Sequence, residues 1–262
     1  LCDRRQRQMC IRDSYVHIKT KTDSTDITVR TDTGFLPCDE RNLAFQAAKK
    51  LQQLFRKNEG VEITIDKNIP VSAGMGGGSS DAAAVLRGLN KLWNLSLEKS
   101  QLAKIGLEID SDVPFCIYSE PALVTGKGEI ITPIGDLEPM CLVIAKPHDS
   151  VSTPSILKKI DYSKIVHQNV DGVLDAISKR DYTEMTKKMG NALEPITAKR
   201  HPDIWKIKQK MLNFGCDAAQ MSGSGPTVFG VCRKYQRAVR VYNGLRGFCN
   251  EVYIVRPFSL KE

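Results

Sequence analysis

The sequence has few aromatic residues, no long hydrophobic run and no paired cysteine motif, and each absence argues against a class of protein. Aromatic residues make up only 6% of the 262 residues and are scattered, which disfavours a base-stacking nucleic-acid interface. No stretch approaches the roughly 20 consecutive apolar residues of a membrane span. No apolar segment follows the first residues either, so we expect neither a membrane anchor nor a secretory signal.

The eight cysteines and four histidines are spread along the chain. No two cysteines form a C-x-x-C pair, and Cys116 lies in an apolar run at 113–117. This pattern favours reduced, buried thiols and a cytoplasmic location over a disulfide framework. The histidines have no Cys or His neighbour at ligand spacing, so we expect no zinc site.

The overall composition is that of a globular protein with a basic surface. Hydrophobic residues make up 41% and charged residues 26%, with a net charge of +8. Lysine and arginine are distributed along the chain rather than gathered in one stripe. A basic surface can bind nucleic acid or small polyanions such as nucleotides. The spread of these charges favours a solvated basic surface over a nucleic-acid face.

The hydrophobic periodicity predicts a mixture of strands and helices. In the first half we expect a hairpin of strands at 15–19 and 25–31, a helix at 42–57, a strand at 61–65, helices at 80–95 and 96–105, and strands at 113–118, 122–125 and 141–145. In the second half we expect helices at 171–178, 181–192, 202–213 and 235–245 and strands at 217–221, 227–232 and 251–255.

The order of these elements lacks a strict strand–helix alternation, which predicts an α+β fold. The residue pattern of the sequence changes near residue 148, and we expect two lobes there, 15–147 and 148–262. Residues 1–14 show no periodicity, and we expect them to be a disordered or non-native-looking tail.

The richest motif is a glycine-rich stretch between the strand at 61–65 and the helix at 80–95, with four glycines in the five positions 74–78. Glycine lets the backbone approach a ligand closely, and a helix N-terminus attracts anions. The stretch lacks the Gly-Lys-Ser/Thr of a Walker A loop, and it does not match a dinucleotide fingerprint. An alternative is a turn that serves only to reverse the chain. We expect the following residues to hold phosphate groups: Pro70, Val71, Ser72, Ala73, Gly74, Met75, Gly76, Gly77, Gly78, Ser79 and Ser80.

Three further features are candidates for the site. Asp110 and Asp112 precede the apolar segment at 113–118, and either carboxylate could accept a proton from a substrate hydroxyl, unless the pair only forms a turn. The segment 222–226 is glycine-rich and lies between two strands, where a hairpin turn is the simpler reading. Asn42 precedes a helix as an N-cap would, and residues 191–194 are expected on a helix surface.

Four stretches together resemble the galactokinase–homoserine kinase–mevalonate kinase–phosphomevalonate kinase (GHMP) superfamily. They are Pro-x-Ser-x-Gly-x-Gly-Gly-Gly-Ser-Ser-x-Ala-Ala at 70–83, Gly-Leu-Asn-Lys-Leu-Trp at 88–93, Asp-Ser-Asp-Val-Pro-Phe at 110–115 and Met-Ser-Gly-Ser-Gly-Pro-Thr-Val-Phe at 221–229. The resemblance runs from about residue 15 to the end. It implies a ribosomal-S5-like N-terminal lobe and a ferredoxin-like C-terminal lobe, with the active site between them.

The resemblance also implies an activity, namely ATP-dependent phosphorylation of a small-molecule hydroxyl with Mg²⁺. Within the superfamily the likeness is to members whose substrate is a polyol linked to cytidine diphosphate. It assigns the catalytic base to Asp112 rather than Asp110, and it implies that Asn42 contacts the nucleotide. Substrate-binding roles are implied for Ser152, Thr153, Ser222, Gly223, Ser224 and Gly225. We expect a monomer or homodimer, with no nucleic-acid or membrane partner.

The chain departs from the superfamily at its start. Relatives open with a strand bearing Ala-Lys-Ile-Asn-Leu and a Gly-Tyr-His segment, and residues 1–14 carry neither. On this ground we expect weak turnover, because a catalytic lysine and a base-recognition element are missing. The alternatives are a homoserine- or mevalonate-type kinase, a nucleotide-binding module without catalysis, and an RNA-binding protein suggested only by charge and the S5-like lobe.

Overall fold

A computed structural model describes residues 14–34, 36–158, 160–161 and 166–257. Their contacts divide into two compact units. We call the unit made of 14–71 and 76–133 the N-terminal lobe, and the unit made of 72–75 and 134–257 the C-terminal lobe. Apart from Ser14, the expected tail lies outside the described residues.

A three-stranded sheet forms the base of the N-terminal lobe. It contains β1 (Tyr15–Lys21), β2 (Ile27–Thr31) and β3 (Gly60–Asp66) in the order β1-β3-β2. β1 pairs with β3 antiparallel and β2 pairs with β3 parallel. The predicted hairpin of the first two strands is therefore wrong. β3 carries three fully buried branched side chains, Val61, Ile63 and Ile65, and such a strand gains most from the central position, with a partner on each edge.

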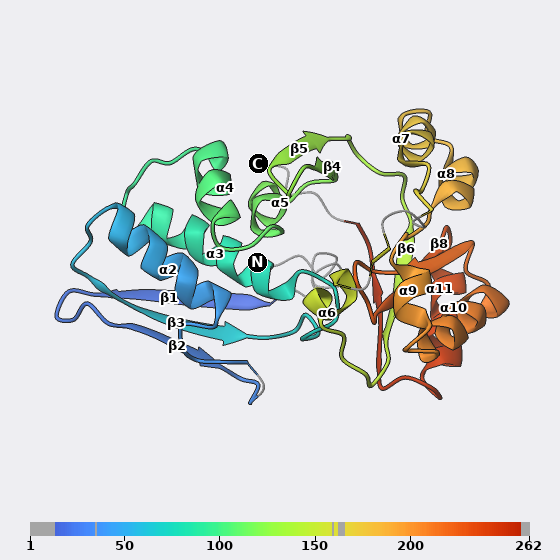
Figure 1. The fold of residues 1–262 in the computed structure, drawn as a ribbon, viewed down its shortest axis with the longest axis horizontal. Coiled ribbons are helices and arrows are strands. Elements are labelled where there is room, and N and C mark those ends of the chain that lie inside the picture. The colour runs from blue at the N-terminus through green and yellow to red at the C-terminus, as the bar shows by residue number, and fades with distance from the viewer. Residues whose placement is uncertain (1–13, 35, 159, 162–165, 258–262) are drawn as a thin grey trace. The chain divides into compact units, whose positions relative to one another are not determined.

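Helices cover one face of this sheet (Figure 1). They are α2 (Leu43–Leu54), α3 (Gly77–Leu92), α4 (Lys99–Leu107) and α5 (Val113–Tyr118), followed by the strand pair β4 (Ala122–Thr125) and β5 (Ile130–Pro133). α2 and α3 each bury alanines, such as Ala44 and Ala82, beside Leu51 and Leu86. These small side chains let the two helices pack closely in the centre of the lobe.

The segment at 113–118, expected to be a strand, is helix α5. Pro114 occupies its first turn, where the fixed φ of proline suits a helix and the missing N–H costs nothing. Val113, Pro114 and Ile117 are buried together, as a helical spacing allows. A short apolar run does not distinguish a buried strand from a buried helix by periodicity, which is why the expectation was wrong.

The C-terminal lobe is built on a four-stranded antiparallel sheet of order β7-β8-β6-β9. Its strands are β6 (Cys141–Lys146), β7 (Ala218–Met221), β8 (Val228–Cys232) and β9 (Glu251–Val255). β6 is a central strand paired on both sides, so it belongs with the C-terminal elements. The lobes therefore separate between Pro133 and Ile134, whereas the change in the sequence predicted a boundary after this strand, near residue 148.

The two faces of this sheet carry different helices. The helices of the C-terminal lobe are α6 (Thr153–Leu157), α7 (Val170–Ser178), α8 (Tyr182–Lys188), α9 (Glu194–Ala198), α10 (Asp203–Phe214) and α11 (Tyr235–Leu245). Val143 shares a core with Met211 and Val241 of α10 and α11, whereas Leu142 packs with the cluster of α7 and α8. Adjacent strand residues thus serve opposite faces. The α+β architecture in two lobes is confirmed.

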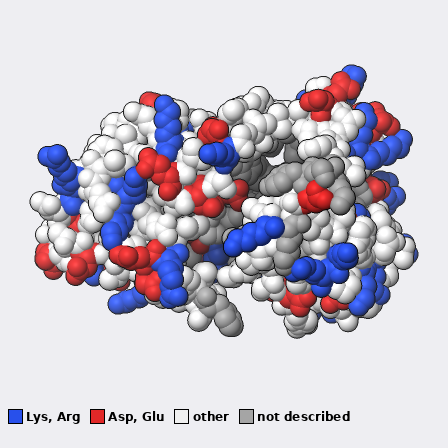
Figure 2. All heavy atoms as spheres, in the orientation of Figure 1, with Lys and Arg blue, Asp and Glu red and all other residues white. Residues whose placement is uncertain are grey.

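The surface shown in Figure 2 mixes both signs of charge. Lysine and arginine lie among aspartate and glutamate over the described residues of this face, without a continuous basic stripe. Among the helices of the described residues, none combines the length and the apolar character that crossing a membrane requires.

Candidate phosphate-binding and catalytic site

The glycine-rich stretch leads directly into α3, which begins at Gly77, three residues earlier than expected. Gly74 and Gly76 have φ of 67° and 61°, a left-handed conformation that glycine adopts without strain. Gly76 is the N-cap and has no side chain to accept from the first turn of the helix. The N–H groups of that turn, together with the helix dipole, form a cradle suited to an anion.

A buried ion pair anchors this first turn from within the N-terminal lobe. Lys67 Nζ lies 2.5 Å from Asp81 Oδ2 and donates to the Gly77 carbonyl at 2.8 Å. The two charged side chains are only 2% and 4% exposed, and Asp81 Oδ1 has no hydrogen-bond partner. Burial raises the pKa of Asp81, although the Lys67 ammonium opposes that shift. Sequence reasoning missed Lys67, because a single lysine after a strand carries no motif.

Asp110 and Asp112 have different surroundings. Ser79 Oγ donates to Asp110 Oδ2 at 2.6 Å, and the backbone N–H of Asp112 donates to the same oxygen at 3.3 Å. Asp110 therefore links the start of α3 to the residue at the N-cap of α5. Among the described residues, no donor binds the Asp112 carboxylate. Loss of water around this carboxylate, and secondly the negative charge of Asp110, raise its pKa. An available carboxylate with a raised pKa is suited to accept a proton.

The turn at 125–129, for which the sequence suggested no role, packs behind this acidic segment. Gly128 has φ of 110°, and a Cβ at its position would collide with the backbone carbonyl of Ser111. Only glycine allows this close approach. The turn therefore supports the backbone between Asp110 and Asp112.

In the C-terminal lobe, the segment at 222–226 forms a tight turn between β7 and β8. The turn is closed by Ser222 N–H donating to Thr227 O at 2.8 Å and Gly225 N–H donating to Ser222 O at 2.9 Å. Ser222 Oγ donates to the Gly74 carbonyl at 2.8 Å. A Cβ on Gly74 would lie 2.7 Å from Ser222 O and 2.8 Å from Gly225 O. The structure thus brings together two glycine-rich stretches that are far apart in the sequence.

Side chains outside the motif hold this turn in place. Asn191 Nδ2 donates to the carbonyls of Met221 and Gly223, both at 2.8 Å. Glu194 Oε2 accepts from Met221 N–H at 2.8 Å and is only 4% exposed. Residues 191–194 were expected on a helix surface, and that expectation is wrong. Because Asn191 and Glu194 are polar, nothing in the sequence indicated that they pack against this turn. Their partners are backbone groups that only the fold brings near.

The remaining candidate residues lie at helix starts. Asn42 is the N-cap of α2: its Oδ1 accepts from Ala44 N–H at 2.9 Å and its Nδ2 donates to Pro37 O at 2.8 Å. Its contact with a nucleotide stays a prediction. Ser152 precedes α6, and Thr153 Oγ1 lies 2.6 Å from Ser224 Oγ, so Thr153 is joined to the glycine turn.

Comparisons with known proteins agree with this arrangement. Residues 42–120 match the family described as GHMP kinases N terminal domain, and residues 173–251 match GHMP kinases C terminal. The chain belongs to the GHMP kinase family.

Two relatives within this family are similar to the chain over most of their length. The chain is 68% identical, over 94% of its length and 85% of the relative's, to the 4-diphosphocytidyl-2-C-methyl-D-erythritol kinase of Ligilactobacillus salivarius. It is 59% identical, over 90% of its length and 82% of the relative's, to the protein of the same name from Lactiplantibacillus plantarum.

Solved structures share the fold. A crystal structure of 4-(cytidine 5'-diphospho)-2C-methyl-D-erythritol kinase matches with a TM-score of 0.75 and 25% identity, covering 93% of this chain and 85% of that one. A homoserine kinase from Cytophaga hutchinsonii matches with a TM-score of 0.80 at 22% identity, covering 93% and 86%, and shows the fold alone.

Proposed function

We propose that this chain transfers the γ-phosphoryl group of ATP to the 2-hydroxyl of 4-diphosphocytidyl-2-C-methyl-D-erythritol. The observation that carries the proposal is its similarity, at 52–68% identity, to relatives named as kinases of that compound. The substrate oxygen attacks the γ-phosphorus, the bond from that phosphorus to the bridging β–γ oxygen breaks, and ADP leaves. Such a step belongs to the synthesis of isoprenoid precursors.

The residues would divide this work between positioning and proton transfer. The stretch from Pro70 to Ser80 would bind the phosphates through backbone N–H groups, with its first turn fixed by Lys67. Asp112 would accept the hydroxyl proton, and Asp110 would position Asp112 through its backbone. The turn at 222–225 and Thr153 would line the substrate side.

The oxygen donors of this region suit Mg²⁺, which is usually held by phosphates with only one or two protein ligands. Ser79, Ser80 and Asp110 offer hydroxyl and carboxylate oxygens, and a bound Mg²⁺ would neutralise phosphate charge. No group of three or more His, Cys, Asp or Glu side chains suited to a metal occurs among the described residues, and a magnesium ion carried by ATP requires none.

We also propose a cytoplasmic location. The six described cysteines are free, and four of them, Cys141, Cys216, Cys232 and Cys249, are buried. Buried free thiols are usual in a reducing compartment.

A steady-state assay with ATP and each alcohol tests the function. We expect turnover with 4-diphosphocytidyl-2-C-methyl-D-erythritol to exceed that with homoserine or mevalonate. Asp112→Asn should lower kcat by about 10²–10⁴-fold, the usual contribution of a general base. Asp175→Asn, which alters an exposed ion pair on α7, is the matched control and should leave kcat unchanged. Faster turnover of another alcohol, or ATP binding with no transfer to any alcohol, would contradict the proposal.

A further inference from the structure

Two cysteines in the core of the C-terminal lobe lie in direct contact. Cys216 precedes β7 by two residues and Cys232 ends β8, and their Sγ atoms are 3.5 Å apart. Cys216 is 8% exposed and Cys232 is fully buried. A disulfide bond is about 2.05 Å long, so the two sulfur atoms need to approach by only about 1.5 Å to form one. The phosphoryl transfer proposed above uses neither thiol.

The chain segments that carry the two thiols are fastened to each other. Asp217 N–H donates to Val231 O at 2.8 Å, and Arg233 N–H donates to Asp217 Oδ2 at 3.0 Å. These bonds join the residue after the first cysteine to the residues on either side of the second. The backbone therefore keeps the two side chains close together.

A glycine in β8 provides the space for Cys216 Sγ. Gly230 and Cys232 are two residues apart in the strand, so they face the same side of the sheet. A Cβ at Gly230 would collide with Cys216 Sγ. The Cys216 side chain therefore lies over the glycine and contacts Cys232, and a larger residue at position 230 would displace it.

The two thiols differ in how readily they ionise. A hydrogen bond with Cys216 lowers the pKa of Cys232, although the loss of water around Cys232 opposes that shift, and the charge of Arg237 lowers this pKa further. The pKa of Cys216 is raised, first by the hydrogen bond with Cys232 and secondly by burial. The first thiolate of the pair is therefore on Cys232, and a thiolate is the nucleophilic form of cysteine.

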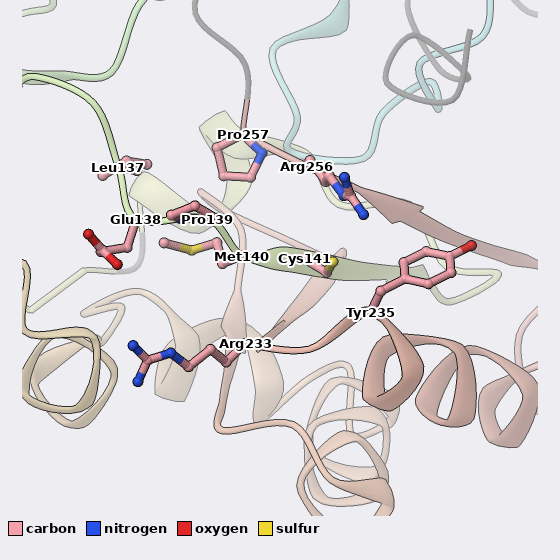
Figure 3. Close-up of a pocket in the computed structure, with 9 residues that line it drawn as sticks. All are labelled: Leu137, Glu138, Pro139, Met140, Cys141, Arg233, Tyr235, Arg256 and Pro257. Atoms are coloured by element: carbon pink, nitrogen blue, oxygen red, sulfur yellow. The ribbon is translucent and has the colours of Figure 1, made fainter. Parts of the chain in front are cut away.

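A pocket of about 370 Å³ lies beside Cys232 (Figure 3). Its lining includes Cys141, which lies directly opposite Cys232 on β6, and Arg233, which follows Cys232 in the chain. Cys232 itself is not among the lining residues. The volume is in the range that takes small organic molecules, so a hydroperoxide that enters the pocket reaches the two neighbours of Cys232.

We propose that Cys216 and Cys232 form a modification site, at which a hydroperoxide produces a reversible disulfide. The Cys232 thiolate attacks one peroxide oxygen, the O–O bond breaks, and the released alkoxide takes up a proton. Cys216 Sγ then attacks the sulfur of the Cys232 sulfenic acid. The S–S bond forms, the S–O bond breaks, and the leaving hydroxide takes the Cys216 proton to become water.

The electrons balance in this sequence. The two thiols together lose two electrons, and the peroxide is reduced to one alcohol and one water, or to two waters if it is hydrogen peroxide. A dithiol reverses the reaction by thiol–disulfide exchange. The disulfide would enclose residues 217–231, which include the glycine turn at 222–226. The proposal does not depend on the identity of the kinase substrate.

Oxidation of the folded full chain by hydrogen peroxide tests the proposal. Peptide mapping by mass spectrometry, without reduction, locates disulfides and oxidised cysteines. Cys216→Ser and Cys232→Ser each remove one thiol of the pair. Cys141→Ser is the matched control, because Cys141 is 3% exposed and belongs to the same hydrophobic core. Circular dichroism verifies that each variant is folded.

In the parent chain and in Cys141→Ser, we expect the disulfide between residues 216 and 232, and dithiothreitol should remove it. In Cys216→Ser, Cys232 should accumulate as sulfinic acid, because no thiol is left to react with its sulfenic acid. In Cys232→Ser, Cys216 should stay reduced. Cys249 of the same core should also stay reduced in every sample, because burial raises its pKa to about 11.

Four results would overturn the proposal. They are two unmodified thiols in the oxidised parent chain, a 216–232 disulfide that appears only after unfolding in urea, oxidation of Cys249 as fast as that of Cys232, and loss of the disulfide in Cys141→Ser. Because the readout is a covalent modification, failure here is distinguishable from failure of the proposed kinase activity.

Discussion

Replacing Lys67 by methionine tests whether the buried ion pair at the first turn of α3 holds the N-terminal lobe together. The substitution removes the ammonium and leaves the Asp81 carboxylate, 4% exposed, without its counter-charge. Breaking a buried pair in this way costs about 3–5 kcal/mol, because the remaining charge is neither solvated nor paired. The Gly77 carbonyl loses its donor as well. We therefore expect a large loss of stability in this lobe.

Urea unfolding, followed by tryptophan fluorescence, measures this loss. Trp93 is 5% exposed and follows α3, the helix that carries Asp81, so it reports on this lobe; Trp205 of the other lobe is replaced by phenylalanine in all samples. For a urea dependence of about 2 kcal/mol/M, the expected loss lowers the unfolding midpoint by roughly 1.5–2.5 M.

A matched control is Lys49→Met, because Lys49 pairs with Glu40 in the same lobe but the two side chains are 43% and 70% exposed. Lys49→Met should lower the free energy of unfolding by less than about 1 kcal/mol. The double variant K67M/D81L removes both buried charges and should recover most of the stability lost by K67M. Two results would contradict this role of the ion pair: K67M and K49M unfolding at the same urea concentration, or K67M/D81L being no more stable than K67M.

Two further predictions concern the acidic segment. The charge of Asp110 raises the pKa of Asp112, so Asp110→Asn should lower that pKa and move the acid limb of the kcat–pH profile to lower pH. Ser79→Ala, which removes a hydrogen bond to Asp110 but no charge, should leave the limb in place, and equal shifts in both variants would contradict the electrostatic explanation. Gly128→Ala should lower kcat and cost about 1–3 kcal/mol of stability in thermal unfolding, because the residue has φ of 110° and its Cβ would collide with Ser111. Gly34→Ala, whose Cβ would meet nothing within 4 Å, is the control, and an equal loss there would exclude the collision as the cause.

The sequence by itself determined the features that depend on local chemistry. The helical spacing of apolar residues predicted α2, α10 and α11, with Gly215 ending α10 at a φ of 114°. The glycine-rich stretch was expected between a strand and a helix, and it lies between β3 and α3; its close approach to a ligand stays a prediction. These features are visible because each residue type acts through its own backbone or its neighbours in the chain.

The tertiary structure decided every feature that depends on a distant partner. β3 inserted between β1 and β2 because its buried side chains need a strand on either side, which no local turn pattern reveals. The segment beginning at Val113 is a helix that buries Val113 and Ile117 in the core of the N-terminal lobe. Lys67, Asn191 and Gly128 acquired roles only where the fold brings them to Asp81, to the glycine turn and to Ser111. Burial and backbone contact set these roles, and both are properties of the folded chain rather than of the residue.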